Sequence, residues 1–139
     1  MNTLPHSQGP MQGGVLTLSQ NLWRLCLALF LTLVGVAHLT VLRLEFQAQV
    51  PPWVPLATDL VVVLSGIVEI GLGLALFWPW VERRRTLLGW VVAFFFVAIF
   101  PGNIAQLVER RSAFGLDTDL KRWLRLPLQP VLIFLALWS

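Results

Sequence analysis

The chain has 139 residues, of which 57% are hydrophobic and 12% charged, and its net charge is +3 at pH 7. A soluble domain is typically about 45–50% apolar and about 25% charged, so this composition excludes an ordinary soluble domain and predicts a single polytopic membrane domain. The single cysteine, Cys26, excludes an internal disulfide and a dithiol pair within the chain. The basic residues cluster at the ends of apolar runs, which indicates anchoring at the membrane interface rather than nucleic-acid binding.

The N-terminal segment MNTLPHSQGPMQGGVLTLSQ is rich in glycine, glutamine, serine and proline. It predicts a disordered tail (residues 1–20) ahead of a transmembrane domain (residues 21–139), and it lacks the basic region and cleavage site of a secretory signal. Three charge-poor runs follow, each near the ~20 apolar residues that cross ~30 Å of hydrocarbon. They are residues 25–42, residues 60–81 with only Glu69 inside, and residues 86–108.

The first helix is predicted from about Asn21 to Leu44, and the proline-rich loop QAQVPPWVP follows it. Pro55 suits the first turn of the second helix, which is predicted to end near Phe77 or Trp80. The short turn VERRR makes the second and third helices antiparallel neighbours. A proline near the far end of the third helix predicts a kink.

The fourth apolar run, residues 126–138, is about 20 Å long as a helix, which is shorter than the hydrocarbon core. Two interpretations fit. In one, the helix begins near Asp119 and bends at Pro127 and Pro130. In the other, Pro127 opens a short helix and the segment DLKRWLR lies at the interface. Both give one fold class, an all-α membrane protein built as a four-helix transmembrane bundle with a short, proline-bent fourth helix.

Polar side chains fall at similar depths along the four predicted helices. Depth is counted at ~1.5 Å per residue from the face that holds loops 45–55 and 109–125. On this count His38, Asn103 and Gln129 lie roughly 6–9 Å deep, and Glu69 lies roughly 15 Å deep. One polar residue per helix predicts a polar pocket that opens on this face, with Glu69 as its floor.

Helical phase places further residues beside this pocket. Ser65 shares a face of the second helix with Glu69, and Gln106 shares a face of the third helix with Asn103. Small residues spaced four apart predict close helix packing. These pairs are Gly71/Ala75, Gly89/Ala93 and Ala98/Gly102.

An ionisable residue at the bilayer centre costs ~2.5–3.5 kcal/mol on insertion scales, so Glu69 is expected to face the bundle interior. In the functional interpretation, Glu69 and His38 handle protons or contact a ligand. In the structural alternative, Glu69 is a neutral acid hydrogen-bonded to Ser65 or to another helix, and His38 makes an interhelical hydrogen bond. The sequence leaves both interpretations open.

Short motifs recur along the chain from about Leu25 to the C-terminus. They are Gly35-x-x-His38, Pro51-Pro52-Trp53-Val54-Pro55, Ser65-Gly66-x-x-Glu69-Ile70 with Gly71-x-Gly73, Phe100-Pro101-x-Asn103-Ile104, and Arg125-Leu126-Pro127-Leu128-Gln129. In order and spacing the set resembles the DoxX-like family of small four-helix bacterial membrane proteins. The resemblance implies a four-helix transmembrane bundle and adds two residues, Trp53 and Arg125, to the ligand-binding candidates. Ala105 stands where many members of that family carry another histidine.

The resemblance also implies two kinds of function, because some members serve quinone-linked sulfur oxidation or thiol stress systems and eukaryotic relatives are assembly chaperones. In the first, the chain is an accessory subunit of a membrane redox system. Its pocket admits a quinone or a similar small ligand, whose oxygens bind His38, Asn103 and Gln129 while Glu69 exchanges a proton. Electrons then come from a partner, because the sequence has no haem-ligand pair, cysteine cluster or nucleotide motif. The alternative is a non-enzymatic assembly factor or chaperone for a partner membrane protein.

The expected partners are the lipid bilayer and another membrane or membrane-associated protein, with no nucleic acid, no metal and no cofactor beyond a quinone. We expect a multi-pass protein of the bacterial inner (plasma) membrane. Cytoplasmic termini are favoured because the arginine triplet 83–85 sits in a very tight turn, where the positive-inside bias is strongest. The opposite face carries more basic residues in total, although several of them lie in a longer loop.

Overall fold

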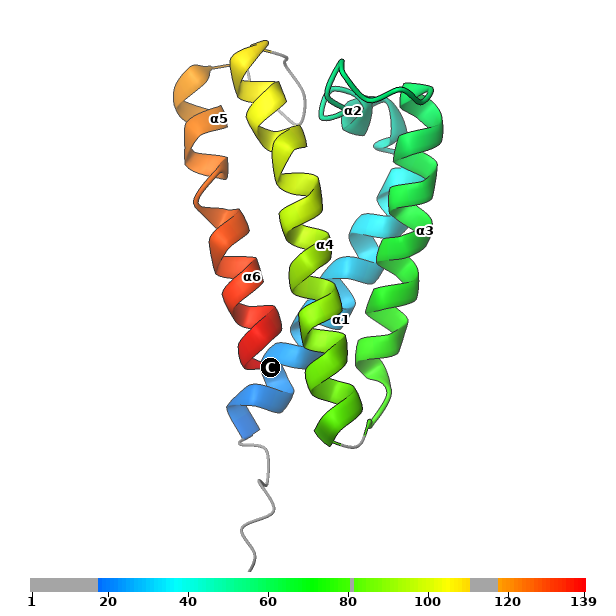
Figure 1. Ribbon diagram of the computed structural model, residues 1–139, viewed down its shortest axis with the longest axis vertical. Helices are drawn as coiled ribbons and strands as arrows, with labels where there is room; N and C mark the ends of the chain where they lie inside the picture. The colour runs from blue at the N-terminus through cyan, green and yellow to red at the C-terminus, as the bar shows by residue number, and fades with distance from the viewer. Residues whose placement is uncertain (1–17, 81, 111–117) are drawn as a thin grey trace, which may run out of the picture.

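The computed structural model describes residues 18–80, 82–110 and 118–139, and every regular element within these ranges is a helix. Figure 1 shows the helices in chain order. They are α1 (Leu18–Leu39), α2 (Arg43–Gln47), α3 (Thr58–Phe77), α4 (Glu82–Val108), α5 (Asp119–Arg125) and α6 (Leu128–Trp138). Residues 1–17 of the predicted disordered tail lie outside the described residues, and residues 18–20 form the start of α1.

Three helices in the described part of the chain are long and apolar enough to cross a membrane: α1, α3 and most of α4, from Arg83 to Val108. Less than a third of each is buried inside the protein, so their outer faces are apolar and exposed. A soluble helix would place polar residues on such a face. The structure is therefore that of an all-helical membrane protein, in agreement with the prediction from composition.

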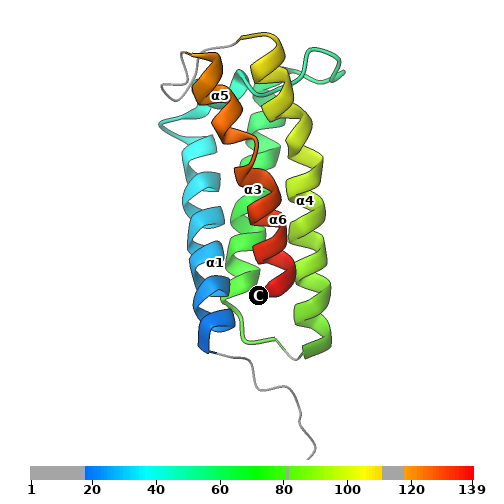
Figure 2. The same cartoon turned by 90° about the vertical axis from the view of Figure 1, so that its left-hand side faces the viewer.

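The helices form two closely packed pairs, α1 with α3 and α4 with α6, whereas α3 and α4 contact each other much less. Figures 1 and 2 show α2 and α5 at one end of the molecule and the C-terminus at the other. At the C-terminal end the side chain of Gln20 on α1 donates a hydrogen bond to the carbonyl of Trp138 on α6, at 3.1 Å. The two pairs are thus joined at that end.

Glycines set the spacing between α1 and α3. A Cβ on Gly35 would lie 2.7 Å from the carbonyl oxygen of Gly66, and a Cβ on Gly66 would lie 2.8 Å from the Cβ of His38. A Cβ on Gly73 would lie 2.8 Å from the carbonyl oxygen of Ala28. Only glycine allows two helices to approach this closely, and small residues are the usual means of helix packing in lipid.

The predicted small-residue pairs do not all pack closely against another helix. Gly89 on α4 does pack closely, because a Cβ there would lie 2.7 Å from the carbonyl oxygen of Ala136 on α6. Gly71 does not, since nothing lies within 4 Å of a Cβ built on it. The prediction that Gly71 packs a helix interface is therefore wrong: Gly66 and Gly73 occupy the buried stripe of α3, and Gly71 lies off it.

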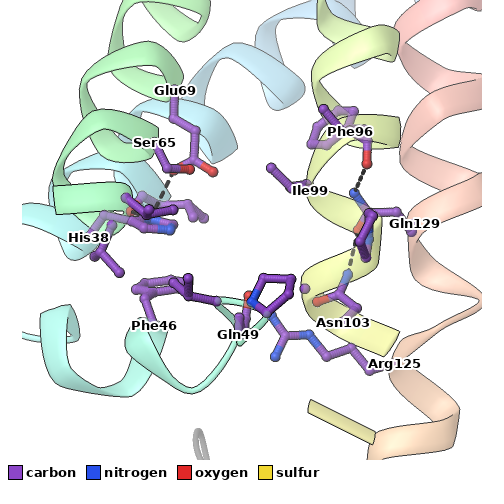
Figure 3. Close-up of a pocket in the computed structure, with 18 of the residues that line it drawn as sticks. His38, Phe46, Gln49, Ser65, Glu69, Phe96, Ile99, Asn103, Arg125 and Gln129 are labelled. Carbon is purple, nitrogen blue, oxygen red and sulfur yellow. Dashed lines mark hydrogen bonds and ion pairs between the residues drawn. The ribbon is translucent and has the colours of Figure 1, made fainter. Parts of the chain in front are cut away.

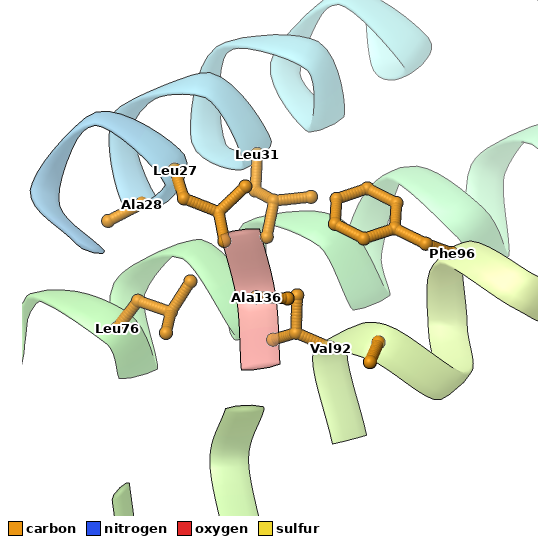
Figure 4. Close-up of a cluster of buried hydrophobic side chains, with 8 residues drawn as sticks. Leu27, Ala28, Leu31, Leu76, Val92, Phe96 and Ala136 are labelled. Carbon is orange, nitrogen blue, oxygen red and sulfur yellow. The ribbon is translucent and has the colours of Figure 1, made fainter. Parts of the chain in front are cut away.

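An apolar cluster fills the C-terminal half of the bundle and draws residues from α1, α3, α4 and α6 (Figure 4). Its buried members are Leu27, Ala28, Leu31, Leu76, Val92, Ala93, Phe96 and Ala136. Because this cluster joins both helix pairs, the bundle is closed at the C-terminal end.

The other end is organised by the segment between α1 and α3, and here two predicted boundaries are wrong. The first helix ends at Leu39 rather than near Leu44, because the N–H of Leu42 turns back to the carbonyl of Ala37 at 3.1 Å. The chain then reverses into α2, which buries Phe46 in a second apolar cluster with Val50 and Val62. α3 begins at Thr58, three residues after the predicted start at Pro55.

The later helices test the predicted position of the arginine triplet and the predicted path of the last segment. The arginine triplet lies in the first turn of α4 rather than in a turn between helices, and Arg85 is buried. α4 continues through Pro101 to Val108. α5 and α6 are separate helices, but the two residues between them, Leu126 (φ −58°, ψ −42°) and Pro127 (φ −64°, ψ −20°), keep right-handed helical dihedral angles.

The α1–α3 contact gives a first prediction with an internal control. Gly66→Ala should lower the thermal unfolding midpoint of the protein in detergent, because the new methyl group clashes with α1 and overpacking of this kind costs about 1–3 kcal/mol. Gly71→Ala on the same helix should leave the midpoint unchanged or slightly raised, since the site is open and alanine favours a helix. Equal midpoints for the two variants would contradict the role of Gly66.

Candidate functional site

A cavity of about 720 Å³ lies between the two helix pairs, at the end where α2 and α5 lie, and all six helices contribute to its lining. Most of the lining is apolar. The predicted site residues His38, Trp53, Ser65, Glu69, Asn103, Arg125 and Gln129 all line it. Gln106 does not line it and lies behind Arg125, to which it is hydrogen-bonded. Figure 3 shows the polar side chains on opposite walls of this cavity.

The wall formed by α1 and α3 carries an acid and a base in contact. Glu69 is 3% exposed, and its Oε2 lies 2.9 Å from Nδ1 of His38. The imidazole is held flat against Phe46 of α2, with ring centroids 3.4 Å apart and an interplanar angle of 13°. The close approach at Gly66 places these two side chains together, because Glu69 follows Gly66 by one turn of α3.

Two oxygen acceptors lie close to Nδ1 of His38, which can donate to only one of them. Nδ1 of His38 lies 2.9 Å from the carbonyl oxygen of Val34 and also 2.9 Å from Glu69 Oε2, yet it carries at most one proton. In the tautomer with its proton on Nδ1, that proton points to the Val34 carbonyl, which leaves the buried Oε2 without a hydrogen-bond donor among the described residues. A buried acceptor without a donor costs about 1–3 kcal/mol. The pair is thus set to accept a proton or a donor group from the cavity.

Ser65 lies one turn before Glu69 on the same face of α3 and also lines the cavity. In the structural alternative its hydroxyl is a hydrogen-bond partner of Glu69. The close polar neighbour of the Glu69 carboxyl in the described structure is His38 on α1, a partner on another helix, which fits the second form of that alternative. Ser65 therefore adds a hydroxyl to this wall without neutralising the acid.

The opposite wall is a chain of amides. Asn103 Nδ2 on α4 donates to Gln129 Oε1 on α6 at 3.1 Å, and Gln129 Nε2 donates to the carbonyl of Phe96 at 2.8 Å. Pro101 has no N–H to offer the carbonyl of Val97, four residues earlier, and the carbonyl that Gln129 engages is that of Phe96, one residue before Val97. Each amide nitrogen keeps a second N–H for the cavity.

The mouth of the cavity is formed by Gln49, Trp53, Lys121 and Arg125. Arg125 Nη1 donates to Gln106 Oε1 at 3.1 Å. With its amide oxygen turned toward the guanidinium, Gln49 accepts from both Nη1 and Nη2 of Arg125 at 2.6 Å. A Cβ on Gly102 would lie 2.3 Å from the carbonyl oxygen of Gln49, so the backbone of this segment rests directly on α4.

Among the cavity residues that the sequence did not predict are Phe46, Gln49 and Lys121. Phe46 and Gln49 follow a helix end that was placed five residues too late, so nothing in the periodicity directed them inward. Lys121 is four residues before Arg125, and this i, i+4 spacing on one helix face was the available signal.

An exposed ion pair lies outside the cavity and fastens α2 to the start of α3. Both Nε and Nη2 of Arg43 donate to the carboxylate of Asp59, the Nε bond at 2.6 Å, and Gln47 Nε2 donates to the same carboxylate at 3.1 Å. The hydrogen bond to Asp59, followed by its negative charge, raises the pKa of Arg43. The pair holds the segment that carries Phe46 and Gln49 in place over the cavity.

The amide wall gives a second prediction. Gln129→Leu should destabilise the protein by about 1–3 kcal/mol, because it leaves the Asn103 amide buried without its acceptor. The double variant Asn103→Leu/Gln129→Leu should lose less than the sum of the two single variants, since it removes both members of the bond. Unfolding midpoints of the four proteins give the coupling, and additive losses would show that the two amides act independently.

Among the described residues no group of three or more histidine, cysteine, aspartate or glutamate side chains is placed to hold a metal ion. No curated protein and no solved structure matches the chain. A family model described as a domain of unknown function, DUF8561, matches residues 27–139, which include all six helices except the first turns of α1 and every residue of the cavity. The chain belongs to the DUF8561 family.

Proposed function

We propose that this protein is an accessory subunit of a membrane redox system and that its cavity binds a quinone or a similar small ligand. The observation that carries the proposal is the buried Glu69, in contact with His38 and short of a donor, on the wall of an otherwise apolar cavity. An ionisable pair within a membrane domain marks a site for protons or ligands more often than a packing device.

The two walls suit a quinone headgroup. Its ring carries two carbonyl oxygens on opposite sides. The spare amide N–H groups of Asn103 and Gln129 can donate to one of them, and Glu69 can donate to the other once its unpaired Oε2 has taken up a proton. The apolar lining suits the ring faces and the start of an isoprenoid tail.

Reduction of a quinone to a quinol takes up two electrons and two protons, one proton at each oxygen. In the proposal Glu69 first takes up a proton from water at its unpaired Oε2 and then passes it to the quinone oxygen at its own wall, which returns Glu69 to the carboxylate form beside His38. The second proton comes from water at the mouth, and a partner subunit supplies both electrons. A quinol hydroxyl then donates to the carboxylate oxygen that lacks a donor in the free protein.

We further propose that α5 and α6 together make a fourth crossing, bent at Leu126 and Pro127. α6 alone spans about 16 Å, whereas residues 119–138 span about 30 Å as one helical path. The helical dihedral angles of both linking residues support a bend rather than a loop. We thus propose a DoxX-like four-helix bundle in the bacterial inner membrane. Its termini are proposed to be cytoplasmic, because the arginine triplet follows a short connection and the positive-inside bias is strongest there.

An assembly factor is the alternative role. The outer faces of the helices keep large apolar side chains exposed, including Phe94 on α4 and Phe134 on α6, and these would be covered by lipid or by a partner membrane protein. A non-enzymatic partner role needs no ligand in the cavity, so binding measurements separate the two functions.

The proposed fourth crossing predicts a topology. Reporters fused after Ser139 and near Gln20 should report the same compartment, since four crossings return the chain to its starting side. Reporters in opposite compartments would remove the fourth crossing and leave the three helices that are long enough to span alone.

The proposed ligand site predicts the behaviour of Glu69 variants. Glu69→Leu should insert well but weaken binding of a short-chain ubiquinone several-fold, because the lost hydrogen bond from the protonated acid to a quinone oxygen contributes about 0.5–1.5 kcal/mol. Quenching of tryptophan fluorescence gives the affinity, since Trp53 lines the cavity. Glu69→Gln should keep abundance and binding yet lose quinone reduction in membranes, because the amide cannot ionise.

The matched control is Glu45→Leu, which replaces an exposed acid at the same end of the protein outside the cavity. It should bind the quinone as the unmodified protein does. Equal quinone affinity of Glu69→Leu and Glu45→Leu would indicate that Glu69 has only a structural role. A failure of the unmodified protein to bind the quinone would favour the assembly factor.

A further inference from the structure

The mouth of the cavity carries positive charge that a quinone does not use. Lys121 and Arg125 lie one turn apart on α5, and both line the cavity. Residues spaced i, i+4 share a helix face, so the two cations point to the same side. The acidic residue among the described lining, Glu69, lies deeper, beside His38.

Arg125 is held in a fixed position. Gln49 accepts from both terminal nitrogens of its guanidinium, and Gln106 accepts from one of them. Gln49 is in turn fixed by its backbone contact with Gly102. A guanidinium oriented in this way presents its charge at one defined place rather than over the range of a flexible side chain.

Lys121 lies two residues after the start of α5, at the outer end of the proposed fourth crossing, and Arg125 lies one helical turn deeper. Gln106, the partner of Arg125, lies two residues before the end of α4 at Val108. Trp53 and Trp123 nearby are 71% and 60% exposed, as expected for tryptophans at the membrane interface. The leucines of α5, Leu120 and Leu124, are also exposed and provide an apolar surface beside the cations.

We propose that the mouth binds the phosphate group of an anionic phospholipid between Lys121 and Arg125, with its acyl chains along the exposed leucines of α5. Basic side chains near the membrane surface attract anionic lipid, by about 1 kcal/mol each. A zwitterionic headgroup brings an ammonium group that two cations repel, so the site selects a net negative charge. The inference goes beyond the proposed function and holds whether or not a quinone occupies the cavity.

The test is lipid retention measured by native mass spectrometry of the full-length protein, released from detergent with equal amounts of phosphatidylglycerol and phosphatidylcholine of identical acyl chains. The unmodified protein should retain phosphatidylglycerol in preference. Lys121→Gln/Arg125→Gln should lower that preference about tenfold or more, as expected for two surface cations. The matched control Arg83→Gln/Arg84→Gln removes two exposed charges at the other end and should keep it.

Because Arg125 also holds Gln49, the single variant Lys121→Gln tests the site without removing that contact, and it should lower the preference by a smaller factor. Equal retention of the two lipids by the unmodified protein overturns the proposal, as does an equal loss in the control variant. Excess inorganic phosphate distinguishes the source of the anion: a protein that binds phosphate without preferring phosphatidylglycerol has a free-anion site, which also overturns the lipid assignment.

Discussion

The close crossing of α1 and α3 at Gly35 and Gly66 is the constraint on which the site depends. In lipid there is no hydrophobic drive between helices, so packing rests on small residues that let backbones approach. Here the same approach has a chemical result. His38 and Glu69 each follow one of these glycines by three residues, so the crossing that packs the helices also brings an imidazole within 2.9 Å of a buried carboxyl. A larger residue at either glycine would separate the helices and the pair together.

The two walls of the cavity differ in how their polar groups are paired. On the amide wall, Asn103 donates to Gln129, and Gln129 donates to the backbone carbonyl of Phe96. On the acid wall, the His38 N–H is directed to Val34 and one oxygen of Glu69 is left over. Such an oxygen destabilises the folded protein unless something in the cavity donates to it. The acid wall thus keeps an unpaired acceptor, whereas the amides of the opposite wall are bonded to each other and to α4.

Counting residues along helices was sufficient to group His38, Glu69, Asn103 and Gln129, because helical rise is constant and membrane helices run nearly parallel. The structure places them around one cavity. The segment after Leu39 could not be predicted in this way. It has no apolar period, and its path is fixed by contacts between distant residues, such as Gln49 against Gly102. The Gln129 contact with the Phe96 carbonyl of α4 could not be predicted either, since side-chain spacing carries no information about which backbone carbonyl a neighbouring side chain will reach.

The two ends of the bundle are held together by different kinds of contact. At the C-terminal end, buried apolar side chains from both helix pairs form one cluster that excludes water and lipid alike. At the other end, the pairs are linked across the cavity by polar contacts, with Gln49 joining the α2 segment to Arg125. Apolar packing varies little with a ligand's charge, whereas contacts of a guanidinium respond to any anion that competes for it. The cavity therefore lies between an apolar base and a mouth that is closed by contacts of Arg125 with amide groups. These closing contacts are the ones for which an anion can compete.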